Sequence, residues 1–143
     1  MLHRKEAELT DPVARYFSRK GYRWQATELP FYEYHIDIYG FSRASDLTVS
    51  IELKIKNWRR AFEQTLVYQL CSDLALMALP KETVHRVDQD LLQAEGIGLL
   101  VVGVSNRCQM ILEPRSSRVV SDTYKRRNIE MLKQKRSRIH ASR

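Results

Sequence analysis

The sequence predicts an α/β protein in which helices flank a mixed β-sheet on both faces. Runs of alternating or continuous apolar residues, typical of strands, are interspersed with segments whose apolar residues recur at the helical period. Short turns join the first strand-like runs, which favours antiparallel pairing, and helical segments join later ones, which favours parallel crossovers. The expected order is helix, three strands, helix, strand, helix, two strands and helix, and 143 residues suit one core.

Apolar residues at helical spacing predict a first helix within residues 5–21, although Pro12 is awkward inside it. This helix is expected to begin near Asp11 as N-cap, or to hold Pro12 in the first turn of a second start. A stretch at 22–32 is expected to be extended but interrupted at Pro30, because proline donates no ladder hydrogen bond. Further strands are expected in residues 32–41, 48–56, 74–80, 97–104 and 107–114, and further helices in 57–74, 81–96 and 121–138.

The composition is that of a soluble globular protein, with 43% hydrophobic and 29% charged residues. The longest apolar run, residues 97–104, is far shorter than the roughly 20 residues of a membrane helix. No apolar segment follows the basic residues near the N-terminus, and Cys71 and Cys108 lack metal-ligand spacing. We therefore expect a cytoplasmic protein with reduced thiols, no membrane partner and no zinc site.

The net charge of +7 is concentrated near the C-terminus, where residues 122–143 contain eight basic and two acidic side chains. Such a segment favours an anionic partner, most simply nucleic acid, although a solvated tail would have the same composition. The expected division is a globular domain at 1–118 followed by a basic C-terminal helix or tail at 119–143.

Two acidic residues and a lysine in neighbouring expected strands are candidates for a catalytic site. Glu52 and Lys54 are two positions apart, so they share one face of their strand, and a short turn would bring Asp37 of the preceding strand beside Glu52. Two inward-facing carboxylates need a positive charge between them, and oxygen ligands suit Mg²⁺ or Mn²⁺. The alternative is a cross-strand ion pair on an exposed face.

These residue types match the needs of phosphodiester cleavage, which requires charge stabilisation on the phosphate and an activated water. Asp37 and Glu52 would hold the metal, with the backbone carbonyl of Leu53 a further potential ligand. Lys54 would contact the scissile phosphate and orient the water or help to deprotonate it.

The pattern of Asp37 followed by Glu52-Leu53-Lys54 resembles the motif of the PD-(D/E)XK, or restriction-endonuclease-like, nuclease superfamily. Ile36 stands where the superfamily name has proline, at a position that varies among members. The resemblance extends from about Glu6 to Val104 and is strongest to small, uncharacterised prokaryotic members. It implies a restriction-endonuclease-like fold and metal-dependent nuclease chemistry.

The helix after the motif carries a second resemblance. Gln64 and Tyr68 are spaced i, i+4 on one helical face, with Arg60 one turn earlier. This is similar to the Gln-x-x-x-Tyr signature of exonuclease-type members, and it implies that these side chains support the metal site or bind substrate. The alternative is the polar face of an ordinary amphipathic helix.

The first helix supplies a glutamate to the metal site in many members of the superfamily. Glu6 and Glu8 both qualify, but Glu6 shares a helical stripe with Leu9 and Val13 and is therefore expected to face the sheet. The resemblance thus implies Glu6 as a third catalytic carboxylate and metal ligand beside Asp37 and Glu52.

The function expected from the sequence is a Mg²⁺- or Mn²⁺-dependent nuclease that acts on nucleic acid, on DNA rather than RNA. The alternative is a catalytically inactive nucleic-acid-binding or assembly protein on the same fold, and a housekeeping RNase is a third reading. The sequence leaves open the strandedness of the substrate and the formation of a homodimer that would address two strands.

Overall fold

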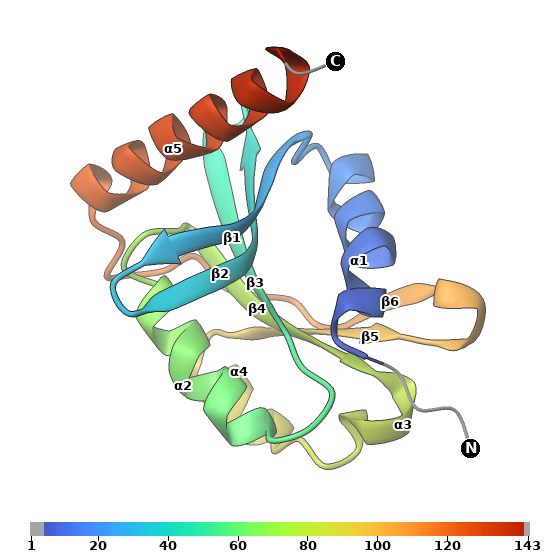
Figure 1. The fold of residues 1–143 in the computed structure, drawn as a ribbon. Coiled ribbons are helices and arrows are strands. Elements are labelled where there is room, and N and C mark those ends of the chain that lie inside the picture. The colour runs from blue at the N-terminus through green and yellow to red at the C-terminus, as the bar shows by residue number, and fades with distance from the viewer. Residues whose placement is uncertain (1–4, 142–143) are drawn as a thin grey trace.

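One mixed β-sheet organises the molecule. The computed structural model describes the backbone of residues 5–141 and the side chains of residues 5–135. Within this range six strands form a single sheet in sequence order, which confirms the expected α/β class (Figure 1). The strands are β1 (Trp24–Phe31), β2 (Tyr34–Ser42), β3 (Leu47–Leu53), β4 (Leu74–Pro80), β5 (Gly98–Val102) and β6 (Cys108–Leu112).

The sheet combines an antiparallel meander with parallel crossovers, as the connections predict. β1, β2 and β3 pair antiparallel, β3, β4 and β5 pair parallel, and β6 returns antiparallel to β5. A helix crossover separates each parallel pair because parallel neighbours cannot be joined by a tight turn. The helices are α1 (Ala7–Arg19), α2 (Trp58–Tyr68), α3 (Lys81–Val84), α4 (Gln89–Glu95) and α5 (Asp122–Ala141), with a 3₁₀ turn at Val104–Asn106.

Helices cover both faces of the sheet. α1 lies alone on one face, where Leu9 and Val13 pack against β2 to β5. α2, α4 and α5 cover the other face, with α5 over β1 and β2, α2 over β3 and β4, and α4 over β5 (Figure 1). β5 is buried along its whole length because both of its faces are covered, which explains its continuous apolar sequence.

Several expected boundaries are wrong, including that of α2, which ends at Tyr68 and not near residue 74. α1 begins at Ala7, so Pro12 lies inside the helix rather than in its first turn, because burial of Leu9 against the sheet stabilises the turn ahead of the proline. β1 continues through Pro30, since this is an edge strand on which a missing N–H can be tolerated. The helix expected at 81–96 is divided into α3 and α4 by a turn that buries Val87.

The first half of α5 is part of the core rather than a solvated tail. Ile129 and Leu132 are buried against the sheet. Lys125 is also buried, and its ammonium group lies 2.9 Å from the carboxylate of Asp73 and donates to the backbone carbonyl of Asp46 at 2.6 Å. Some of the basic charge therefore fixes α5 to the β2–β3 turn and to the start of β4. Among the described residues no helix is both long and apolar enough to cross a membrane.

Replacing Lys125 with alanine should lower the free energy of unfolding by about 3 kcal/mol, because it leaves Asp73 without its buried partner. Lys133→Ala on the same helix is the matched control. Its exposed ammonium group lies 3.8 Å from Glu130, so its loss should change stability by less than about 0.5 kcal/mol. Urea unfolding of the three proteins measures both values, and equal effects of the two substitutions would contradict the structural role of Lys125.

Candidate active site

Asp37 and Glu52 lie opposite one another where β2 and β3 separate. The ladder between these strands ends at the pair Ile38 and Ile51, which confirms the predicted antiparallel pairing and makes Asp37 and Glu52 the next facing positions. Beyond this point the carboxylate of Asp37 accepts a hydrogen bond of 2.8 Å from the backbone N–H of Leu53. The side chain of Asp37 therefore accepts the hydrogen bond that a backbone carbonyl would accept in a regular ladder. The strands separate at this point, and the carboxyl groups of Asp37 and Glu52 lie between them.

Tyr68 holds the Glu52 carboxylate from the opposite side. Its hydroxyl donates to Oε1 of Glu52 at 2.9 Å and lies 3.3 Å from the backbone carbonyl of His35. Tyr68 is fully buried and Glu52 is only 5% exposed, so their hydrogen bond is shielded from water. α2 thus reaches the acidic pair through its last residue.

Burial shifts the protonation of both acids. Removal from water, followed by the charge of Asp37, raises the pKa of Glu52 to about 8, against the opposing effects of Tyr68 and Lys54. Burial also raises the pKa of Asp37 to about 6, although the N–H of Leu53 favours its ionised form. Burial thus disfavours the ionised form of both carboxyl groups, and Glu52 resists ionisation even at neutral pH. A bound cation would lower this electrostatic cost.

The two acids open into a polar cavity of about 530 Å³. α2 contributes Arg60 and Gln64, one helical turn apart, as the i, i+4 spacing predicts. The Oε1 atom of Gln64 is buried and has no hydrogen-bond partner among the described residues. The cavity is lined by Glu33, Tyr34, His35, Asp37, Glu52, Arg60 and Gln64.

The donor atoms fit a hard divalent cation. Two carboxylates and an unpartnered amide oxygen are the oxygen ligands that Mg²⁺ and Mn²⁺ prefer. Within the described part of the chain, however, no third Asp, Glu, His or Cys joins them in one metal-binding group. The structure therefore offers a two-carboxylate site whose remaining ligands would be backbone, amide or water oxygens.

Glu6 does not join the acidic pair. Glu6 precedes α1 and is exposed. The apolar face of this helix that packs on the sheet begins only at Leu9, which is buried, so it does not include Glu6. Its charge still contributes to raising the pKa of Asp37. Glu8 is likewise exposed, and neither glutamate lines the cavity.

Lys54 lies beside the site but not on the cavity wall. β3 ends at Leu53, one residue before the lysine, so the predicted shared strand face with Glu52 does not extend that far. The backbone N–H of Lys54 donates to Ala78 on β4, and the half-buried side chain is close enough to favour the ionised form of Glu52.

Sequence reasoning missed the contribution of the turn between β1 and β2. Glu33, Tyr34 and His35 line the cavity, and Tyr32 at the tip of this turn is 64% exposed with a positive φ of 54°. His35 is two positions before Asp37 on β2, and this spacing is the sequence signal that could identify it. Glu33 and Tyr34 gave no such signal, because their position depends on how the turn folds over α2.

The fold and site together define a mixed α/β protein with a buried pair of acids at a break in the sheet. No family model and no curated protein matches the sequence. Among solved structures, the chain is similar to the SPO1766 protein of unknown function from Silicibacter pomeroyi, with a TM-score of 0.73 and 19% sequence identity over 96% of this chain and 90% of that one. At this identity the likeness establishes the fold alone.

Metal-free protein should become less stable as the pH rises from 4.5, the ordinary pKa of glutamate, to about 8, the folded value for Glu52. In this window the folded state binds protons that the unfolded chain releases, so the free energy of unfolding falls with pH. Glu52→Gln should remove on the order of 5 kcal/mol of this dependence. Urea unfolding in EDTA across this range measures it, with Glu82→Gln as an exposed control. An unaltered pH profile in Glu52→Gln would contradict the assigned shift.

Mg²⁺ or Mn²⁺ should raise the melting temperature of the wild-type protein near neutral pH, because a cation favours the ionised acids. At a hundredfold excess over Kd, binding would add about 2.7 kcal/mol to the free energy of unfolding. Asp37→Asn and Glu52→Gln should each lose most of this metal-dependent increment, and Glu82→Gln should keep it. Differential scanning calorimetry with and without metal gives the increment for each protein. If Asp37→Asn and Glu52→Gln both keep the wild-type rise in melting temperature, the cation binds at a different site.

Proposed function

We propose that the protein is a metal-dependent nuclease that hydrolyses phosphodiester bonds, with DNA as the expected substrate, on a restriction-endonuclease-like fold. One observation carries this proposal: Asp37, Glu52 and the unpartnered oxygen of Gln64 meet in a polar cavity where two strands part. The cavity is large enough for a cation together with a phosphate group. The sequence resemblance supports the same chemistry.

Each residue of the site has a role in this reaction. When bound, a divalent cation would polarise a phosphate oxygen and make a water molecule more acidic. Asp37 and Glu52 would hold that cation, and Gln64 would offer an oxygen to it or to its water. Tyr68 fixes the orientation of Glu52 through the hydrogen bond of 2.9 Å.

Two cations of the protein are available to the phosphate. Arg60 lines the cavity and can bind a phosphate oxygen through its guanidinium group. Lys54 has a long, flexible side chain beside Glu52, and rotation of that side chain would bring the ammonium group to the reacting phosphate. Neither the guanidinium group of Arg60 nor the ammonium group of Lys54 takes part in the ion pairs and hydrogen bonds described above.

A second candidate function is that of a nucleic-acid-binding or assembly protein that does not cleave. The exposed position of Glu6 favours it, because the site then lacks the third carboxylate that the superfamily resemblance implied. Exposed basic side chains on α5, such as Arg127 and Lys133, would serve either function by binding phosphates.

Purified protein should cleave at least one of single-stranded DNA, duplex DNA, branched DNA or RNA in the presence of Mg²⁺ or Mn²⁺, and EDTA should abolish the cleavage. Glu52→Gln and Lys54→Ala should each lower the rate by about 100-fold or more, because each removes a charge that acts on the reacting phosphate. Gel electrophoresis of end-labelled substrates measures the rates.

Glu82→Gln and Lys81→Ala, on the exposed helix α3, are the matched controls and should cleave at the wild-type rate. Nucleic-acid binding without metal-dependent cleavage of any substrate would favour the second candidate function. Cleavage that survives both EDTA and Lys54→Ala would arise from a different mechanism and would contradict the proposal.

A further inference from the structure

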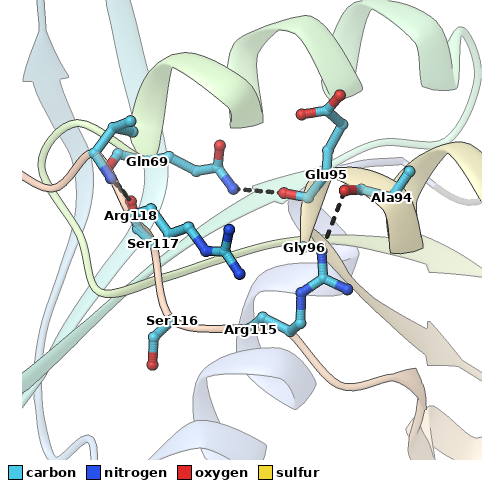
Figure 2. Close-up of a pocket in the computed structure, with 9 residues that line it drawn as sticks. Gln69, Ala94, Glu95, Gly96, Arg115, Ser116, Ser117 and Arg118 are labelled. Carbon is cyan, nitrogen blue, oxygen red and sulfur yellow. Dashed lines mark hydrogen bonds between the residues drawn. The ribbon is translucent and has the colours of Figure 1, made fainter.

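A second cavity, of about 250 Å³, lies where α2 and α4 end beside the segment that joins β6 to α5. Gln69 comes from the end of α2, residues 94–96 from the end of α4, and residues 115–119 from the joining segment (Figure 2). None of these residues lines the cavity of Asp37 and Glu52. The function proposed above therefore makes no use of this cavity.

Hydrogen bonds hold the joining segment in place although it has no regular secondary structure. The backbone N–H of Arg115 donates to the carbonyl of Gly96 at 2.9 Å, and that of Ser117 donates to the carbonyl of Asp73 at 2.8 Å. The hydroxyl of Ser117 donates to the carbonyl of Gln69 at 2.7 Å. The side chains on this segment are thus presented from a fixed backbone.

Arg115 is oriented by the end of α4. Its Nη2 atom donates to the carbonyl of Ala94 at 3.1 Å, a contact typical of a basic residue at a helix C-terminus. Its side chain crosses Gly96, whose φ of +73° suits glycine, and a Cβ atom at that position would come within 3.4 Å of the arginine. Helix capping accounts for one N–H of this guanidinium group and leaves its other donors for a ligand.

Arg118 has no comparable structural partner. Its guanidinium group points into the cavity toward that of Arg115, while the carboxylate of Glu95 is directed away (Figure 2). Among the described residues, Arg118 makes no hydrogen bond and neither arginine forms an ion pair. Two exposed guanidinium groups are thus directed into one cavity without a carboxylate between them, and an anion placed there would interact favourably with both.

We propose that Arg115 and Arg118 form a binding site for a phosphoryl group, separate from the carboxylate cavity. Guanidinium groups bind phosphate oxygens through paired N–H donors, and two of them directed into one cavity can bind the same phosphate. The cavity exceeds the volume of a single phosphate group, so part of an attached sugar can enter. The phosphoryl group would come from the end of a nucleotide strand or from an internal phosphodiester.

The first test is titration of the metal-free protein with inorganic phosphate, followed by calorimetry or by NMR of the arginine side chains. Wild-type protein should bind phosphate, and Arg118→Ala should weaken binding by about tenfold, the value of one charge-assisted hydrogen-bonded contact. Arg86→Ala, at an exposed arginine that does not line the cavity, is the matched control and should bind as wild type does. Arg118 contacts no other described side chain through a polar bond, so its variant should fold normally, and equal melting temperatures check this.

The second test separates the sources of the phosphoryl group. A short 5′-phosphorylated oligonucleotide and its 5′-hydroxyl counterpart are titrated in EDTA against wild type, Arg118→Ala and Arg86→Ala. Preference for the phosphorylated strand that disappears in Arg118→Ala indicates a terminal phosphate, whereas an equal loss for both strands indicates internal phosphodiesters. Arg86→Ala should bind both strands as wild type does, and EDTA keeps the result independent of metal-dependent cleavage.

Three outcomes would overturn the proposal. The first is that inorganic phosphate leaves the wild-type signals unchanged at about 10 mM, a concentration at which even weak sites fill. Arg118→Ala could bind phosphate and both strands as tightly as wild type. Alternatively, Arg86→Ala could lose as much affinity as Arg118→Ala, which would show that general positive charge, and not this cavity, attracts the anion.

Discussion

The hydrogen bond from the backbone of Leu53 to the carboxylate of Asp37 determines the geometry of the candidate site. It ends the pairing of β2 and β3 with a side chain, so the strands part while both remain in the sheet. Glu52 is then left in the gap, where Tyr68 fixes its carboxylate. The acidity, depth and polarity of the cavity all follow from this break, because it turns two facing strand residues into an inward-facing pair.

The basic residues of the C-terminal segment fall into two groups, those that hold α5 on the sheet and those left for an anionic partner. Composition alone does not distinguish the two groups. Lys125 and Arg126 bond to Asp73 and Asp46, so they hold α5 on the sheet. The ammonium group of Lys135 donates to the carbonyl of Thr27 on β1. Only part of the charge concentrated at 122–143 is therefore free to meet an anionic partner, and a truncation of this segment would remove core residues as well as charge.

Much of the fold and half of the candidate site follow from periodicity. Strand alternation and a short turn place Asp37 opposite Glu52, and helical spacing places Arg60 and Gln64 on one wall of the cavity. These relations join residues that are close in the sequence, so strand alternation and helical spacing are enough to predict them. The positions of Glu6 and Lys54 differ from expectation because each lies just outside a regular element, where periodicity no longer fixes direction.

The sequence by itself determined the class of fold, the pairing of the first three strands and the acidic pair at their boundary, since hydrophobic pattern and turn length are local properties of the chain. Only the tertiary structure decided which charges are buried, which of the candidate residues share a cavity, and that the segment with Arg115 and Arg118 lies beside the ends of α2 and α4. Those relations depend on how segments distant in sequence pack, and no local pattern specifies the distance between them.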